Sequence, residues 1–88
     1  MKIIITGDGK VGHSLSEKLS KDENDVTIID KNIEPLKRSD ELLDVMVIQG
    51  SGANVRTLIE AGVEKADLLI AATNSDELNM VCCLTASV

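Results

Sequence analysis

A short apolar segment runs directly into a glycine-rich turn near the start of the chain, and this junction constrains the fold more than any other feature. Residues 2–6 read Lys-Ile-Ile-Ile-Thr, and Gly7, Gly9 and Gly12 follow at the spacing G-x-G-x-x-G. Gly7 lets the chain turn sharply off a strand, Gly9 leaves its main chain open to a bound group, and Gly12 lets a helix approach the sheet. The pattern predicts a strand, a tight turn and a helix in succession.

The backbone of this turn is suited to an anion. We expect the N–H groups from Gly9 to Gly12 to lie unpaired at the start of the helix, where the positive end of the helix dipole also lies. Asp8, Lys10 and Val11 fill the remaining positions of the turn and belong to the predicted site. Backbone groups can hold a diphosphate without a side-chain base, so the turn predicts a dinucleotide site if the rest of the unit follows it.

A carboxylate stands where such units hold a ribose. The apolar segment 26–29 ends at Asp30, which follows Gly12 at close to the roughly 20-residue spacing expected for this acid. Asp30 can accept hydrogen bonds from a ribose diol and would repel a 2′-phosphate, which favours NAD over NADP. Lys31 weakens that preference without reversing it. Adenosine nucleotides carry the same diol, so NAD, ATP and ADP all remain open from Asp30 alone.

Length and composition exclude several classes of protein. The chain has 88 residues, 43% hydrophobic and 27% charged, which is typical of one globular domain. Its apolar stretches are far shorter than the 18 or so residues that cross a bilayer. A net charge of −6 and the absence of Phe, Tyr and Trp argue against nucleic-acid and anionic-membrane surfaces. We expect a cytosolic protein with no nucleic-acid partner and no membrane insertion.

Neither the cysteines nor the histidine indicates chemistry. Cys82 and Cys83 are adjacent, a spacing that fits neither a redox pair nor a metal site, and we expect them to be buried or half-buried thiols. His13 is the single histidine, and the sequence shows no acid or base to partner it, so we expect a structural or surface role. We assign no catalytic residue and no metal ligand.

Apolar segments alternate with helix-compatible segments along the whole chain. The predicted strands are residues 2–6, 26–29, 45–48 and 68–72, and the predicted helices follow Gly12, Asn32, Asn54 and Asn74, the third closing at Gly62 and the last containing residues 80–84. The apolar residues expected to pack these helices on a sheet are Val11, Leu15, Leu19, Leu36, Leu42, Leu43, Val55, Leu58 and Ile59. This alternation predicts a Rossmann-like α/β fold: a parallel sheet in the order 3-2-1-4 with helices on both faces.

The ligand is expected at the carboxyl ends of strands 1 and 4, where the strand order reverses. The residues predicted to border this place are Gly7 to Gly12, Asp30, Lys31, Gly50, Ser51, Gly52, Ala72, Thr73 and Asn74.

The chain ends at Val88 inside the predicted last helix, and the usual fifth and sixth strands are missing. We therefore expect residues 1–88 to form a single, partial nucleotide-binding domain that is truncated after the fourth strand and its helix. The outer edge of strand 4 would then be exposed, which predicts a homo-oligomer, either a dimer or a larger ring.

Several phrases of the sequence are more specific than the glycine pattern. Residues 60–67 read EAGVEKAD, residues 71–73 read AAT and residues 76–79 read DELN. Together with the GDGKVG turn and the Gly50-Ser51-Gly52 turn, they make the whole chain resemble the N-terminal domain of TrkA-type potassium-uptake regulators, the TrkA-N, KTN or RCK family.

The resemblance implies regulation and no catalysis. Domains of this family bind NAD or NADH, or ATP and ADP in relatives, assemble as rings or tetramers on the cytoplasmic face of a membrane potassium channel or transporter, and gate it. By position, Gly7 to Val11 would hold the pyrophosphate and Asp30 the adenosine ribose. Ser51 would lie near the adenine, and Thr73 and Asn74 near the second nucleotide half. The chain departs from the family at Lys10, where Arg is frequent, and at Ser51, where an acidic or amide residue is common.

Two other functions remain to be weighed against a nucleotide sensor. The chain would serve equally as the cofactor-binding half of an NAD-dependent dehydrogenase, but that reaction needs a proton-transfer group beside the nicotinamide, and the sequence offers no tyrosine and one unfavourably placed histidine. A pure assembly module would have the same fold and an empty crevice. Nucleotide binding without turnover distinguishes the sensor from both.

Overall fold

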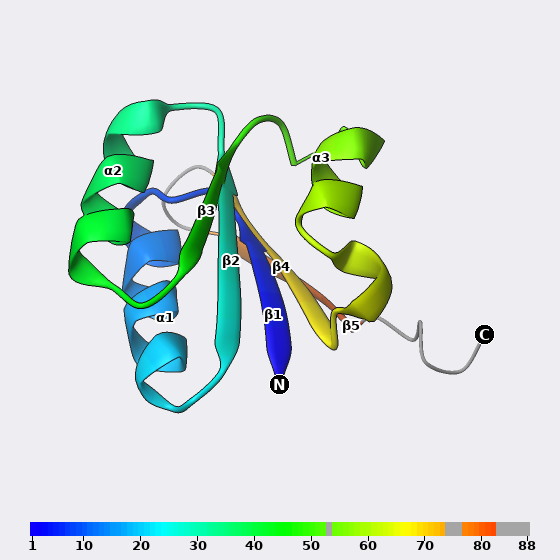
Figure 1. Cartoon of the computed structure of the whole chain (residues 1–88), viewed down its shortest axis with the longest axis horizontal. Helices are drawn as coiled ribbons and strands as arrows, with labels where there is room; N and C mark the ends of the chain where they lie inside the picture. Colours follow the sequence, from blue (N-terminus) through cyan, green and yellow to red (C-terminus); the bar gives the residue numbers. More distant parts are fainter. Residues whose placement is uncertain (53, 74–76, 83–88) are drawn as a thin grey trace.

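The computed structural model describes residues 1–52, 54–73 and 77–82, which form one five-stranded sheet flanked by helices (Figure 1). In chain order the elements are β1 (Lys2–Thr6), α1 (Lys10–Lys21), β2 (Asp25–Asp30), α2 (Ile33–Leu42), β3 (Met46–Gln49), α3 (Val55–Glu60), a 3₁₀ turn η1 (Val63–Lys65), β4 (Leu68–Thr73) and β5 (Glu77–Cys82). The strand order is β3-β2-β1-β4-β5. Strands β1 to β4 are parallel, which confirms the predicted Rossmann-like order 3-2-1-4.

The central strand is buried on both faces. Ile3, Ile4 and Ile5 of β1 are at most 1% exposed. Because side chains alternate along a strand, Ile3 and Ile5 pack on the α1 and α2 side while Ile4 packs on the α3 side. Figure 1 shows α1 and α2 on one side of the sheet and α3 on the other. Two-sided burial explains the continuous isoleucine run and confirms helices on both faces.

The helices bury fewer apolar residues than the periodicity predicted. Leu15 and Leu19 of α1 pack against the core, and Leu36 of α2 is fully buried. In contrast, Leu42, Val55 and Ile59 are 70%, 68% and 51% exposed, so their predicted burial is wrong. Leu42 is the last residue of α2, and α3 has only six residues, of which Leu58 reaches the core.

Two of the three predicted helix boundaries have the expected capping. The Asn54 side chain accepts from the backbone N–H groups of Arg56 and Thr57 at 2.9 and 3.4 Å and so caps α3. Gly62, with φ +87°, follows α3 in the left-handed conformation that favours glycine. Asn32 stands at the N-cap position of α2, but its side chain makes no capping bond.

The prediction of a helix after strand 4 is wrong for the residues described. Residues 77–82 form β5, which runs antiparallel to β4 with Thr73 opposite Glu77 and Leu68 opposite Cys82. A capping-box spacing is a local signal, whereas pairing with β4 provides partners for the backbone groups along a strand edge. The exposed outer edge of strand 4, from which we predicted an oligomer, is therefore occupied by β5. Asn74 and Cys83 lie outside the described residues.

Candidate functional site

The glycine turn joins β1 to α1 and packs tightly against β4. Gly7 has φ +101°, and a Cβ at this position would lie 2.2 Å from the carbonyl oxygen of Ala72. A Cβ on Gly12 would lie 2.1 Å from the carbonyl oxygen of Gly7. Both glycines are therefore required by close backbone packing, as predicted from their spacing.

Gly9 differs from its two neighbours in the motif. A Cβ on Gly9 would meet no atom within 4 Å, and Gly9 is the N-cap of α1 without a side-chain capping bond. The N–H groups of the first turn of an α-helix have no intrahelical acceptor. The open space beside Gly9 leaves room for a phosphate group near the start of α1.

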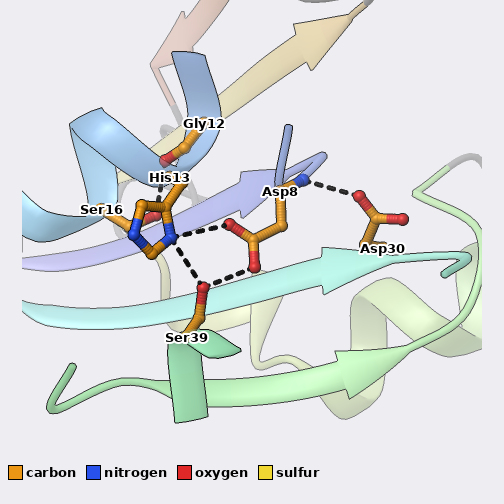
Figure 2. A network of polar contacts seen from close by, with 6 residues as sticks. All are labelled: Asp8, Gly12, His13, Ser16, Asp30 and Ser39. Carbon is orange, nitrogen blue, oxygen red and sulfur yellow. Dashed lines mark hydrogen bonds and ion pairs between the residues drawn. The ribbon is translucent and has the colours of Figure 1, made fainter. Parts of the chain in front are cut away.

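Asp30 ends β2 beside the turn, and two backbone donors orient its carboxylate. Its Oδ2 accepts from the N–H of Asp8 at 2.6 Å, as Figure 2 shows, and its Oδ1 accepts from the N–H of Asn32 at 2.8 Å. Each carboxylate oxygen has two acceptor sites, so each keeps one for a further donor. The half-buried carboxylate is thus held in place and can still accept two hydroxyl groups.

A crevice of about 530 Å³ opens at the carboxyl ends of the parallel strands. Its lining residues are Thr6, Gly7, Ile29, Asp30, Lys31, Asn32, Gly50, Gly52, Ala71 and Ala72. The structure thus brings residues from three separate turns and from β4 to one place, at the edge where ligands bind in open α/β sheets.

The turn after β3 closes one side of this crevice. The N–H of Gly50 donates to the carbonyl oxygen of Asp30 at 2.9 Å. A Cβ on Gly52 would lie 2.7 Å from Cβ of Thr6, so the turn packs directly on the end of β1. The absence of a side chain on Gly52 allows this close approach.

The other predicted site residues lie around this crevice in different ways. Asp8, Gly9 and Lys10 line a second hollow of about 430 Å³, between the glycine turn and α2, together with His13, Ser14, Pro35 and Arg38. Val11 and Gly12 belong to the first turn of α1. Ser51 lies in the turn after β3, and Thr73 is the last residue of β4.

A buried polar cluster lies under the glycine turn (Figure 2). The Asp8 side chain is inside the protein, only 3% of the residue being exposed, and its Oδ2 accepts from the hydroxyl of Ser39 at 2.5 Å. Nδ1 of His13 lies 3.0 Å from the same hydroxyl oxygen and 3.6 Å from Oδ1 of Asp8. Because the Ser39 proton is directed to Asp8, Nδ1 of His13 is the donor to Ser39 in this arrangement. The cluster joins the turn to both α1 and α2.

The charge of Asp8 is only partly compensated. Burial raises the pKa of Asp8 from its usual value of 3.8, while the hydrogen bond from Ser39 and the proximity of His13 lower it. The neighbouring Asp30 raises it further. Within the described part of the chain, Oδ1 of Asp8 has no hydrogen-bond partner.

The expectation that His13 has no acidic partner is wrong, because Asp8 and Ser39 both lie beside it. The order of the three groups nevertheless differs from a Ser-His-Asp triad, in which the histidine stands between the serine and the acid and takes the serine proton. Here Ser39 stands in the middle, gives its proton to Asp8 and is fully buried. This geometry does not activate Ser39 as a nucleophile.

The sequence contained one signal for this cluster. Ser39 lies three residues after Leu36 and four before Leu43, on the apolar stripe of α2, and Ser16 stands in the same way between Gly12 and Leu19 of α1. The hydroxyl of Ser16 donates a hydrogen bond to the carbonyl oxygen of Gly12 at 2.7 Å. A polar residue on an apolar stripe therefore marks a buried hydrogen bond.

Metal-binding clusters and membrane-spanning helices are both absent from the described part of the chain. No group of three or more His, Cys, Asp or Glu side chains there is arranged to hold a metal ion. In the same residues, no helix has the length and apolar character needed to span a membrane.

The fold is a Rossmann-like nucleotide-binding fold. Its defining features are a parallel sheet, a glycine turn at the point where the strand order reverses, and an acid at the end of the neighbouring strand. The sequence profile of the TrkA-N domain matches residues 3–88. The chain belongs to the TrkA-N domain family.

Curated relatives are similar over nearly the whole chain. The Trk system potassium uptake protein TrkA of Halomonas elongata is 45% identical over 86 residues, which cover 98% of this chain and 19% of that protein. The TrkA homolog 1 of Methanosarcina mazei is 51% identical over 98% of this chain and 20% of its own length. TrkA of Haemophilus influenzae is 46% identical over 94% of this chain and 18% of its own length. The chain spans about a fifth of the length of these relatives.

Proposed function

We propose that the chain is the nucleotide-binding module of a regulator of potassium transport, with NAD or NADH bound in the crevice. Family membership and relatives named potassium uptake proteins support the regulatory role. The fold and the crevice support a nucleotide as the ligand.

The observation that carries the proposal is that Asp30 lies beside the glycine turn, where the first backbone N–H groups of α1 have no intrahelical acceptor. Both oxygens of Asp30 are oriented by backbone N–H groups, and each can still accept a ribose hydroxyl. The start of α1 faces open space at Gly9. A dinucleotide presents a ribose diol and a diphosphate on one molecule, which matches these two features. ATP and ADP share them and are the alternative ligands.

The remaining predicted residues have subsidiary roles in the proposed complex. Lys10 would neutralise phosphate charge as a point charge, without the bidentate geometry of arginine. Lys31 would lie beside the adenosine ribose, and the turn of Gly50, Ser51 and Gly52 beside the adenine. Thr73 and Asn74 would lie near the second half of the dinucleotide.

In this proposal the nucleotide is a signal and is not consumed. Its binding shifts a population of conformations, and a homo-oligomeric assembly passes this shift to a membrane potassium channel or transporter. The protein would then be cytoplasmic and peripheral to the membrane through that partner. A ligand with different affinities for two states supplies a coupling free energy of typically about 1–3 kcal/mol.

Titration with NADH tests the proposal directly. The chain has no aromatic residues, so NADH fluorescence is recorded without a protein background. Asp30→Ala removes charge-assisted hydrogen bonds to the ribose and is expected to weaken NADH binding by about tenfold or more. Asp25→Ala is the matched control, because Asp25 is an exposed acid at the opposite end of the same strand.

Calorimetry with NAD, NADH, ATP and ADP then ranks the ligands. Binding of NAD or NADH without turnover supports the sensor. No binding of any of the four nucleotides, or equal NADH affinity in the Asp30→Ala and Asp25→Ala variants, contradicts the proposal. Hydride transfer from bound NADH to a substrate would support the dehydrogenase alternative instead.

A further inference from the structure

We propose that Asp8 is a positioning residue of the nucleotide site: its buried side chain, held by Ser39 and His13, fixes the backbone N–H that orients Asp30 for a ribose diol. The inference deepens the proposed function and rests on it, because it concerns how the same site recognises its ligand.

The first step concerns the backbone on either side of Asp8. Gly7 and Gly9 flank it, and glycine has the largest conformational freedom of any residue. The N–H of Gly7 donates to the carbonyl oxygen of Ile29 at 2.6 Å, which fixes one side of the turn. Because Gly7 and Gly9 have no side chains, only the side chain of Asp8 can attach this part of the turn to the rest of the protein.

The second step is that this side chain is firmly attached. Asp8 is 3% exposed and Ser39 is fully buried, and a 2.5 Å hydrogen bond joins them. Ser39 belongs to α2, so this hydrogen bond ties the turn to α2, and Nδ1 of His13 in α1 lies 3.0 Å from the Ser39 hydroxyl oxygen and 3.6 Å from Oδ1 of Asp8.

The third step connects this attachment to the ribose-binding acid. The N–H of Asp8 gives a 2.6 Å hydrogen bond to Oδ2 of Asp30 (Figure 2). The N–H of Asn32 holds the other oxygen at 2.8 Å. If the turn moves at Asp8, Asp30 keeps only one of its two orienting donors, and its carboxylate can rotate away from the position that faces a diol.

The role requires the shape and the hydrogen bonds of Asp8 and does not require its charge. In Asp8→Asn an amide oxygen can still accept from Ser39. The amide nitrogen then takes the place of Oδ1, which accepts no hydrogen bond from the described residues, so no hydrogen bond is lost there. In Asp8→Ala the hydrogen bond from Ser39 is lost. Asparagine should therefore restore the Ser39 hydrogen bond that alanine removes.

The experiment compares five variants of the full chain: Asp8→Ala, Asp8→Asn, Ser39→Ala, Asp30→Ala and the double variant Asp8→Ala/Asp30→Ala. The affinities for NADH and NADPH are measured by nucleotide fluorescence, at a temperature where circular dichroism shows each variant to be folded. The NADH/NADPH affinity ratio reports on the orientation of the Asp30 carboxylate, because that charge repels a 2′-phosphate. A loss of folded protein lowers both affinities alike and leaves the ratio unchanged.

Asp8→Ala and Ser39→Ala are expected to weaken NADH binding by about tenfold and to lower the preference for NADH over NADPH. Asp8→Asn is expected to bind NADH within about threefold of the unsubstituted chain. The double variant should bind no more weakly than Asp30→Ala, since Asp8 acts through Asp30.

Three results would overturn the inference while leaving the proposed function intact. They are additive losses in the double variant, an unchanged NADH/NADPH ratio in both Asp8→Ala and Ser39→Ala, and an Asp8→Asn variant as weak as Asp8→Ala. If Asp8→Ala does not fold, Ser39→Ala and Asp8→Asn provide the same comparison. An unsubstituted chain that binds no NADH, or an Asp30→Ala variant with unchanged affinity, would instead contradict the proposed function itself.

Discussion

Asp8 and Asp30 share one hydrogen bond, yet their surroundings are opposite. Asp30 is half-buried, and two backbone N–H groups orient it while it still faces the crevice. Asp8 is buried, with one oxygen bonded to Ser39 and the other without a hydrogen-bond partner among the described residues. The two acids therefore have different tasks. The carboxylate of Asp30 is accessible to a ligand, and the buried carboxylate of Asp8 holds the glycine turn in place.

The glycine turn contains Asp8 and donates a hydrogen bond to Asp30, so a substitution that displaces the turn should disturb both acids. A methyl group on Gly12 would lie 2.1 Å from the carbonyl oxygen of Gly7, which belongs to the backbone and cannot rotate away. We expect Gly12→Ala to lower the free energy of unfolding by about 3 kcal/mol or more. Chemical denaturation followed by circular dichroism measures this value, and a loss below about 1 kcal/mol would show that the helix start can shift.

Replacing each acid by alanine tests the two tasks separately. Asp8→Ala leaves the buried hydroxyl of Ser39 without its acceptor, and we expect it to cost about 2 kcal/mol of unfolding free energy. Asp30→Ala should cost about half as much, because the N–H groups that it leaves lie beside the open crevice and can be hydrated. The same denaturation curves measure both. Equal losses would remove the distinction between a structural and a ligand-binding acid.

The free energy of unfolding should also depend on pH through Asp8. Because burial raises the folded-state pKa of Asp8 above 3.8, the folded protein binds this proton more tightly than the unfolded chain does. The contribution of Asp8 to stability is therefore fully present below about pH 3.8 and is lost as pH rises through the folded-state pKa. Asp8→Asn, which does not titrate, should gain stability relative to the unsubstituted chain over that interval. Denaturation of both at about pH 3.5 and pH 7 measures the difference, and a gain in the opposite direction would contradict the assignment.

The sequence correctly predicted those segments whose own residues favour the conformation that they have in the fold. The isoleucines of β1, the glycines of the turn and Asp30 each follow from their own short segment. The order of the four parallel strands follows from the alternation of strands and helices along the chain. The crevice followed from the same rule, since the carboxyl ends of parallel strands meet at one edge.

Contacts between distant segments were not predicted. The hydrogen bond from Ser39 to Asp8 spans 31 residues, and nothing in either segment alone indicates its partner. Likewise, β5 depends on an open strand edge at β4, which the capping-box pattern at residues 74–77 does not reveal. The exposure of Val55 depends on how few residues of α3 reach the sheet.

The smallest effect on stability is expected at Gly9, which directly follows Asp8 in the glycine turn and is the N-cap of α1. A methyl group there would meet no atom within 4 Å, so Gly9→Ala should change the unfolding free energy by no more than about 0.5 kcal/mol. The methyl group would instead occupy the space proposed for the diphosphate, and NADH binding should weaken by about tenfold or more. Gly12→Ala is the matched comparison, because the same substitution three residues later acts through packing. If Gly9→Ala leaves NADH affinity unchanged, the diphosphate does not lie at the start of α1, and Asp30 alone cannot define the site.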